Sequence, residues 1–437
     1  MSRPRIVIVG GGFAGHNAAR VLHDSLADTA DIVLINPTDY FLYLPLLPEV
    51  AAGVLDPRRV SVSLSATLPG VQCVLGEATA VDVEGRRVTV RTPEDDTVDL
   101  SYDRLILAAG SVNALLPIPG VTQNAHGFRG VPEAVYLRDH ITRQIELADL
   151  TDDPAERDAR CTFVVVGAGY TGTEVAAQGP LLTTALIRNR PRLHGQRVRW
   201  MLLDKAGRVL PGLDHRLGRT ADRVLRRRGV EVLTGMSISE ATPDGVTLET
   251  GEGVPSRTLV WCVGVRADPI AESLGLPTTK GRIDVDEYLG VPGHPELFAC
   301  GDAAAVPDLT RPGELTAMTA QHAERQGRLV AHNVAASLGE GDRSAYRHHD
   351  LGFVVDLGGV SAAANPLGVP LSGLAAKAVT RGYHLMAMPG NRLRVATDWL
   401  LDAVQRRQSV QLGMVRSPAV PLDSSAPELA KSPRPQD

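Results

Sequence analysis

The sequences IVIVGGGFAG (residues 6–15) and FVVVGAGYTG (residues 163–172) decide the fold of this chain. Each begins with four apolar residues, which are typical of a buried strand, and continues into the pattern G-x-G-x-x-G and a stretch that suits a helix. The glycines permit a tight turn and let backbone N–H groups approach a pyrophosphate at the N-terminus of that helix. Two such segments predict two dinucleotides in one chain, with electrons passing between them.

The composition narrows the class of protein. A length of 437 residues predicts two or three domains, and a formal net charge of −5 argues against nucleic acid as a partner. The four cysteines form no C-x-x-C pair and have no zinc-type spacing with histidine, so we expect no metal site and a reduced, intracellular protein. The first strand follows the N-terminus directly, and no apolar run is long enough to span a bilayer. We therefore expect neither a signal peptide nor a transmembrane helix.

The residue that ends the second strand of each dinucleotide unit differs between the two units. Such units usually place an acidic residue there, which binds the adenosine ribose. In the first unit the position is Asn36, which can still form a hydrogen bond but carries no charge. In the second unit it is Asp204, whose carboxylate accepts from a ribose 2′-hydroxyl and repels a 2′-phosphate. The second unit is therefore predicted to prefer NADH to NADPH, although Lys205 and Arg208 lie close in sequence.

Four features carry a resemblance to the flavoprotein oxidoreductases that hold two dinucleotides and, within them, to the type II NADH dehydrogenases (NADH:quinone oxidoreductases). The first feature is the N-terminal fingerprint with residues 39–41 and 45–47, and the second is the sequence AAG at residues 108–110. The third is the second fingerprint with Glu174. The fourth is Gly301-Asp302 followed by Thr319-Ala320-Gln321. The resemblance covers the chain except for its C-terminal tail.

The resemblance implies FAD at the first fingerprint and NADH at the second. The residues implied for FAD are Gly10, Gly12, Phe13, Ala14, Gly15, Asn36, Gly110 and Asp302. Those implied for NADH are Gly167, Gly169, Gly172, Asp204 and Gly264. Asp302 is expected to bond the ribityl or pyrophosphate region of the flavin.

Three catalytic residues are implied in the same way, each with a simpler interpretation beside it. Glu174 is expected near the contact between nicotinamide and flavin, although a carboxylate in the first turn of a helix also stabilises the helix dipole. Gln321 is expected to donate a hydrogen bond to a quinone carbonyl, although it also suits an ordinary helix start. Lys377 lies in the C-terminal region, where the family has a lysine near the flavin.

Residues 393–404 raise the question of membrane contact. Apolar side chains there, including Trp399, can share one helical face with arginines around it. Such a helix suits the surface of an anionic membrane, but it also suits docking on the protein body or in a homodimer. The resemblance implies peripheral membrane attachment, so we expect the protein at the cytoplasmic face of the cell membrane or in the cytoplasm.

The predicted fold is α/β, with two Rossmann-like dinucleotide-binding domains (FAD and NAD) and a small C-terminal α+β region. The FAD domain is expected at residues 1–115 and 290–335, and the NAD domain at 116–289. Residues 336–412 are expected to form the membrane-association or dimer region. Residues 413–437, which are rich in proline, serine and charge, are expected to be disordered.

The predicted function is transfer of a hydride from NADH to FAD and of electrons on to a membrane quinone, without proton pumping. Dithiol flavoenzymes and sulfide:quinone oxidoreductases need cysteines near the flavin, which this chain does not supply. An NAD(P)H-dependent ferredoxin or rubredoxin reductase needs none and stays an alternative. A non-catalytic NADH-sensing flavoprotein is a second alternative, because Asn36 departs from the expected pattern.

Overall fold

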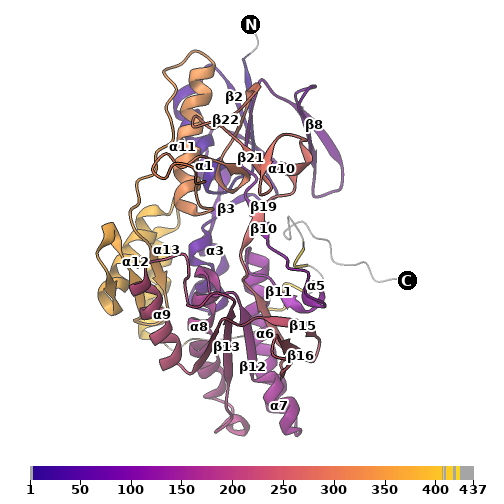
Figure 1. Cartoon of the computed structure of the whole chain (residues 1–437), viewed down its shortest axis with the longest axis vertical. Coiled ribbons are helices and arrows are strands. Elements are labelled where there is room, and N and C mark those ends of the chain that lie inside the picture. The colour runs from indigo at the N-terminus through magenta and orange to yellow at the C-terminus, as the bar shows by residue number, and fades with distance from the viewer. Residues whose placement is uncertain (1–2, 406, 408–409, 417–419, 424–437) are drawn as a thin grey trace. The chain divides into compact units, whose positions relative to one another are not determined.

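The computed structural model describes residues 3–405, 407, 410–416 and 420–423 (Figure 1). The chain folds into two compact units, each assembled from separate segments. Unit 1 consists of Met1–Leu42, Ser61–Val112 and Val265–His349, and unit 2 of Tyr43–Val60, Asn113–Gly264 and Asp350–Asp437. This division differs from the expected one. The C-terminal region expected at residues 336–412 is split, with residues up to His349 in unit 1 and those from Asp350 in unit 2. Residues 43–60 belong with the second dinucleotide unit, and the return to the first begins at Val265 rather than near residue 290.

Unit 1 is built on a six-stranded sheet. Its strand order is β22 (Gly290–Val291), β23 (His294–Ala299), β9 (Arg104–Leu107), β1 (Arg5–Val9), β2 (Asp31–Asn36) and β5 (Gln72–Leu75). All neighbours pair in parallel except β22 and β23. The central strands are continuous apolar runs because both faces of such a sheet are covered. Helix α1 (Phe13–Leu26) packs closely against α11 (Ala320–Ser337), which returns from late in the chain.

Smaller elements complete unit 1. One antiparallel sheet contains β6 (Glu77–Asp82), β7 (Arg87–Arg91) and β8 (Thr97–Ser101), and β3 (Tyr40–Leu42) pairs with β4 (Ser61–Ser63). A third sheet contains β20 (Thr278–Thr279), β21 (Arg282–Asp284) and β24 (Ala304–Ala305). The short helices are α4 (Leu64–Thr67), α10 (Ile270–Ser273) and η3 (Gly301–Ala303). The chain passes between the units near β10 (Ser111–Asn113) and β19 (Val265–Ala267).

Unit 2 contains the second dinucleotide fold, a five-stranded parallel sheet. Its order is β11 (Ala125–His126), β18 (Thr258–Trp261), β12 (Thr162–Val166), β13 (Arg199–Asp204) and β14 (Val230–Thr234). The longer helices are α6 (Val131–Leu150), α7 (Pro154–Arg160), α8 (Tyr170–Ile187) and α9 (His215–Arg227). The short ones are η1 (Leu44–Leu46), α2 (Leu47–Ala51), α3 (Pro57–Val60), α5 (Val121–Asn124) and η2 (Pro191–Leu193). An antiparallel sheet contains β15 (Ile238–Thr242), β16 (Gly245–Leu248) and β17 (Gly253–Pro255).

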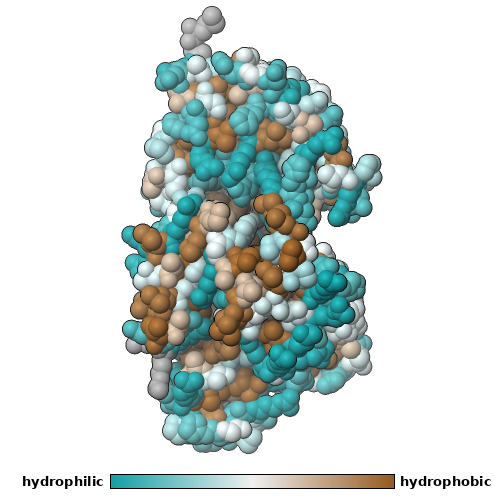
Figure 2. Space-filling view, turned by 90° about the vertical axis from the view of Figure 1, so that its left-hand side faces the viewer, coloured by the Kyte–Doolittle hydropathy of each residue, from teal (hydrophilic) through white to brown (hydrophobic). Residues whose placement is uncertain are grey.

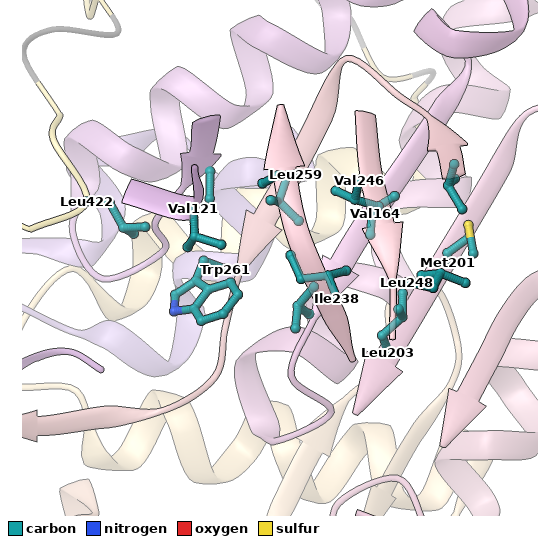
Figure 3. Packing of buried hydrophobic residues seen from close by; sticks show 14 residues of the cluster. Val121, Val164, Met201, Leu203, Ile238, Val246, Leu248, Leu259, Trp261 and Leu422 are labelled. Carbon is teal, nitrogen blue, oxygen red and sulfur yellow. The ribbon is translucent and has the colours of Figure 1, made fainter. Parts of the chain in front are cut away.

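The core of unit 2 lies between its parallel sheet and the β15–β17 sheet (Figure 3). Apolar side chains of both sheets meet there, and burial of each contributes about 1.5–3 kcal/mol. Leu422 joins this core, and its carbonyl oxygen accepts a hydrogen bond from Asn113 Nδ2 at 3.2 Å. Most of the expected disordered tail lies outside the described residues, but this part of it is packed.

The C-terminal part of unit 2 is a small α+β layer. Strands β25 (Val354–Asp356), β26 (Ala362–Ala364) and β27 (Leu371–Ser372) form an antiparallel sheet, with η4 (Pro366–Gly368) before β27. Helix α12 (Gly373–Ala387) packs on this sheet, and α13 (Arg392–Val404) follows. The predicted fold class is therefore confirmed: two Rossmann-like units with a small C-terminal α+β region.

Helix α13 does not present one apolar face. Val395 and Trp399 are buried, whereas Leu393 is 84% exposed, Leu400 63% and Val404 71%. The expectation that these residues share a face is wrong, because two of them are used to pack the helix onto unit 2. Figure 2 views the side of the molecule on which Figure 1 draws α12 and α13, and apolar residues gather on that face. Within the described residues, no helix has the length and apolar character needed to cross a membrane.

Candidate dinucleotide sites and a buried acid–lysine cluster

The first glycine loop joins β1 to α1 and is closed by backbone contacts. Gly10 has a φ of 98°, and a Cβ there would lie 2.3 Å from the carbonyl oxygen of Ala108. A Cβ on Gly15 would lie 1.8 Å from the carbonyl oxygen of Gly10, so both positions require glycine. Gly12 is different, because a Cβ there would meet no atom within 4 Å. Gly12 is also the N-cap of α1 and offers no side chain to the helix, so the open space in front of the N–H groups suits a phosphate.

Phe13 and Ala14 hold the start of α1 in place. The Phe13 ring packs edge-to-face against Phe41, with 5.0 Å between ring centroids. Ala14 is buried against α11: a Cβ on Gly327 would lie 2.1 Å from the Ala14 carbonyl oxygen. A Cβ on Gly301, which has a φ of 68°, would lie 3.1 Å from the Ala14 Cβ. These two expected FAD-binding residues therefore position the loop within the fold.

Asn36 contacts the first loop directly. Its Oδ1 accepts a hydrogen bond from Gly11 N at 2.7 Å, and its Nδ2 donates to the carbonyl and hydroxyl oxygens of Thr38 at 2.9 and 3.0 Å. These bonds fix the direction of the amide group. The second lone pair of Oδ1 can still accept from a ribose hydroxyl, as expected from the sequence, but without the charge of a carboxylate.

Asp302 and Gly110, two residues expected to bind FAD, are linked in unit 1 through Ser111, which follows Gly110 and bonds to Asp302. Asp302 Oδ2 accepts from Ser111 Oγ at 2.7 Å, and burial raises the pKa of the Asp302 carboxyl against the opposing effects of Ser111 and Arg282. Gly110 has a φ of 76°, and a Cβ there would meet no atom within 4 Å, so space beside it is open.

Arg282 is a polar residue of this site that the sequence analysis missed. It is 7% exposed, and its Nη1 donates to the Thr316 carbonyl at 3.0 Å. Its Nε and Nη2 are buried and have no partner within the described part of the chain. Buried donors are costly when unpaired, so Arg282 fits a site that receives an acceptor-rich ligand. In the sequence, Arg282 is only the first residue of a three-residue strand, β21 (Arg282–Asp284), which gives no signal of a ligand site.

Gln321 and Gln326 stand in different environments on α11. Gln326 is 1% exposed; its Oε1 accepts from Gly301 N at 2.8 Å and its Nε2 donates to Thr316 Oγ1 at 3.1 Å. Its amide is therefore used to hold the Gly301 turn. Gln321 lies in the first turn of α11, where Thr319 is the N-cap, and its side chain is half-buried. Of the two side chains, that of Gln321 is the more exposed.

The second glycine loop, in unit 2, repeats the geometry of the first. Gly167 has a φ of 103°, and a Cβ there would lie 2.2 Å from the Cys262 carbonyl oxygen. A Cβ on Gly172 would lie 1.8 Å from the Gly167 carbonyl oxygen. Gly169, the N-cap of α8, and Gly264, with a φ of 111°, would each carry a Cβ into open space.

Asp204 anchors the second loop with both carboxylate oxygens. Oδ2 accepts from Ala168 N at 2.5 Å and Oδ1 from Ala206 N at 2.7 Å. The two basic neighbours have other partners. Lys205 pairs with Glu249 at 2.9 Å, and Arg208 donates to backbone carbonyls of residues 210–213. Within the described residues, neither basic side chain forms a hydrogen bond or ion pair with the Asp204 carboxylate.

Glu174 and Lys377, far apart in the sequence, are joined in unit 2 by Asp356, which the sequence analysis missed. The Glu174 carboxyl on α8 accepts from the backbone N of Asp356 at 2.8 Å. The Lys377 ammonium on α12 donates to both Asp356 carboxylate oxygens, at 2.6 and 2.5 Å. All three side chains are buried. Asp356 ends strand β25, so the C-terminal layer brings this group to the N-terminal part of α8. Glu174 lies just beyond the first turn of that helix, and the expectation that it lies within the first turn is wrong.

A third carboxyl, Glu49 on α2, completes this acid–lysine cluster. Its Oε1 lies 3.8 Å from Lys377 Nζ, and its Oε2 accepts a hydrogen bond from the Trp399 indole N–H on α13. The Arg381 guanidinium lies over the Trp399 ring, 4.7 Å from its centroid. No sequence signal marked Glu49, because a glutamate in a short proline-broken segment resembles any loop residue.

The cluster contains three buried carboxyls and only one ammonium. Ionisation of one carboxyl therefore makes ionisation of the others less favourable. Burial raises the pKa of the Glu174 carboxyl well above its ordinary value. Burial, reinforced by the charge of Asp356, raises the pKa of Glu49 to about 7, against the opposing effects of Lys377 and Trp399. Burial therefore favours the neutral form of Glu174, and Glu49 exchanges between its two forms near neutral pH, while Asp356 pairs with the ammonium.

Comparison with known proteins places the chain in a family. Residues 4–327 match the family described as pyridine nucleotide-disulphide oxidoreductase. The chain is 31% identical to the type II NADH:quinone oxidoreductase Ndh of Mycobacterium tuberculosis over 93% of this chain and 89% of that protein. It is 32% identical to NdhA of the same organism, over 90% and 85%. The fold matches that of NDH2 from Plasmodium falciparum in complex with NADH, with a TM-score of 0.86, 18% identity and coverage of 94% and 100%.

The chain belongs to the pyridine nucleotide-disulphide oxidoreductases and, within them, to the type II NADH:quinone oxidoreductase family. The resemblance inferred from the two fingerprints is thereby confirmed. It is a flavoprotein oxidoreductase by family, and the roles of its individual residues follow below as proposals.

Proposed function

We propose that this chain oxidises NADH and reduces a membrane quinone, using FAD held by unit 1 and NADH held by unit 2. One observation carries the proposal: both glycine loops keep the space before a helix N-terminus open, at Gly12 and Gly169, while the neighbouring glycines are closed against backbone. Two open phosphate sites in a member of this family fit a dinucleotide cofactor and a dinucleotide substrate.

The residues of unit 1 fit FAD. The N-terminus of α1 would hold the pyrophosphate, and Asn36 Oδ1 would accept from the adenosine ribose. Arg282 would direct its two unpaired donors to acceptor atoms of the cofactor, and Asp302 would face its ribityl and pyrophosphate region. When bound, FAD accepts a hydride from NADH and passes two electrons to the quinone.

The residues of unit 2 fit NADH. Gly169 and the N-terminus of α8 would hold its pyrophosphate, and the Asp204 carboxylate would accept from the ribose 2′-hydroxyl. The same charge repels the 2′-phosphate of NADPH, so we propose a preference for NADH. Gly264 would leave room for the backbone to approach the nicotinamide.

Three side chains would act on the reacting ends of the substrates. Glu174, whose burial raises its pKa and favours the neutral form, would orient the nicotinamide. Lys377 would supply a held ammonium that stabilises developing negative charge. Gln321 would donate its amide N–H to a quinone carbonyl oxygen.

Anaerobic stopped-flow spectroscopy tests the function. The purified protein is mixed with NADH, and the visible flavin band is followed before a soluble quinone analogue is added. Rapid bleaching by NADH and reoxidation by quinone are expected. Bleaching without reoxidation would favour a reductase of a protein acceptor, and a flavin that NADH does not bleach would favour a sensor. In Gln321→Leu, reoxidation should slow by about 10²-fold while bleaching is unchanged, since one hydrogen-bond donor is lost. Equal losses in both steps would reject the quinone role of Gln321.

Membrane contact through the C-terminal helices is part of the proposal. Apolar residues of α12 and α13 are exposed: Leu374, Met386, Leu393, Leu400, Leu401 and Val404. A gathered apolar surface of this kind favours insertion into the interface of a bilayer.

Cosedimentation with vesicles of mixed neutral and anionic lipids tests the contact. Leu393→Glu should weaken binding by roughly tenfold or more, whereas Leu150→Glu, at another exposed leucine, should not. If both variants bind as well as the native protein, the apolar surface has another occupant. Sedimentation equilibrium would then decide whether it is a second copy of the chain.

A further inference from the structure

Glu49 is buried without being part of either dinucleotide loop. It lies on α2, which packs against α6 and α8, and only 3% of its surface is exposed. A buried carboxyl is costly unless it is paired or bonded. Glu49 has one partner on each oxygen: the Lys377 ammonium at 3.8 Å and the Trp399 indole N–H.

We propose that Glu49 is a positioning residue for Lys377. When Glu49 is ionised, the Lys377 ammonium interacts with both Glu49 and Asp356. When Glu49 is protonated, the ammonium pairs with Asp356 alone. The catalytic consequence rests on the proposed function, but the positioning itself does not.

The two contacts of Lys377 are unequal, which makes the position of its ammonium adjustable. Asp356 holds Nζ with two hydrogen bonds of 2.6 and 2.5 Å, whereas Glu49 lies at ion-pair distance, 3.8 Å, without a hydrogen bond. In a buried site a unit charge acts strongly at this distance. Ionisation of Glu49 therefore pulls the ammonium toward α2.

The surroundings of Glu49 explain why it changes charge near neutrality. The charged or titratable groups that face it are Lys377 and Arg381 from α12, Asp356 from β25 and Glu174 from α8, while α13 contributes the uncharged Trp399. His384 of α12 also belongs to this region, and burial lowers its pKa to about 4, so it is neutral. Helix α6 presents no ionisable group that shifts the pKa of Glu49. With that pKa at about 7, Glu49 is an acid below neutrality and a carboxylate above it.

Trp399 provides a direct report of the charge on Glu49. Its indole N–H donates to Glu49 Oε2, and a hydrogen bond to a carboxylate is stronger than one to a neutral acid. The other two tryptophans donate to neutral partners, Trp200 to Thr183 and Trp261 to the Ala114 carbonyl. The three indole signals should therefore respond differently to pH.

The test follows the indole N–H cross-peaks of the holoenzyme labelled with ¹⁵N-tryptophan, over about 1.5 pH units on each side of neutrality. Trp399→Phe assigns the signal. In the native protein the Trp399 cross-peak should move with a midpoint near pH 7, and in Glu49→Gln it should stay fixed. Gln keeps the shape of the side chain and still accepts the indole bond, and Glu240→Gln, at an exposed carboxyl, is the matched control. A Trp399 signal that does not move in the native protein, or that moves equally in Glu49→Gln, would overturn the proposal.

The catalytic consequence is measured as a pH profile. The rates of flavin reduction and reoxidation should change between the acid and alkaline sides of neutrality by roughly tenfold, the effect of one pKa unit, in the native enzyme. In Glu49→Gln the profile should lose this change and keep its acid-side rate at every pH. A variant whose rates fall equally at all pH values would show only a structural role for Glu49. Failure of quinone to reoxidise the flavin would reject the proposed function but leave the cross-peak result intact.

Discussion

The two glycine loops share a backbone but differ in the side chain that anchors them. The last glycine of each loop is equally close to the backbone of the first glycine. A Cβ on it would lie 1.8 Å from the first glycine's carbonyl oxygen in both loops. Each also has a loop N–H that donates to the residue ending the second strand: Gly11 to Asn36 at 2.7 Å and Ala168 to Asp204 at 2.5 Å. The residue at this position therefore serves the loop itself before any ribose arrives, and its charge is a separate property.

The segments that follow the two anchors explain why they differ. After β2, the carbonyl and hydroxyl oxygens of Thr38 accept from Asn36 Nδ2, so that segment needs a donor. After β13, the backbone N of Ala206 donates to Asp204 Oδ1, so that segment needs an acceptor. Asn36 therefore supplies a hydrogen-bond donor that its own turn requires and that an aspartate could not provide.

The largest effect is expected when a Cβ is placed on the last glycine of either loop, which tests the backbone geometry that the loops share. Gly15→Ala should destabilise unit 1 by about 3 kcal/mol or more and abolish FAD retention, because the new atom meets backbone that cannot move aside. Gly172→Ala should do the same to unit 2 and to NADH binding. Urea unfolding and flavin content measure both. Gly12→Ala is the control: it should fold normally and lose only cofactor affinity, and a destabilisation equal to that of Gly15→Ala would contradict the geometry.

A smaller effect is expected when the charge of the second anchor is removed. In Asp204→Asn the new amide can accept from only one of the two N–H donors, and the repulsion of a 2′-phosphate disappears. The KM for NADH should rise by roughly tenfold, corresponding to about 1.4 kcal/mol, while NADPH becomes a better substrate. Steady-state kinetics with both nucleotides measure the change. An unaltered ratio of kcat/KM values would remove Asp204 from the nucleotide preference.

The smallest effect is expected when a charge is introduced at the first anchor, by replacing Asn36 with aspartate. In Asn36→Asp a carboxylate oxygen would face the Thr38 carbonyl in place of a donor, costing unit 1 about 1–2 kcal/mol. Repulsion would raise the folded-state pKa of the introduced carboxyl above its unfolded value of about 3.9. The penalty should therefore be absent in acid and appear as the pH rises through and above that value. Thermal unfolding at several pH values checks this, and a variant more stable than the native protein at pH 7 would contradict the donor role of Asn36.

Local patterns predicted the loops because their chemistry is contiguous in the chain. A strand, a glycine-rich turn and a helix start follow one another within ten residues, so Gly10, Gly167 and the strand ends at Asn36 and Asp204 could be recognised directly. The face of α13 could not be predicted in the same way. Helical periodicity grouped Trp399 with Leu400, but only packing on unit 2 decides which of them is buried.

The sequence by itself determined two dinucleotide units, the open positions in their glycine loops and the class of cofactor chemistry, because these depend on neighbouring residues and backbone sterics. Only the tertiary structure decided the acid–lysine cluster. Its members come from α2, α8, β25 and α12, and the pKa values of Glu49 and Glu174 depend on burial and on charges brought from distant segments. Charge and desolvation act through space, so the folded arrangement determines which carboxyls have a raised pKa and which one holds the lysine.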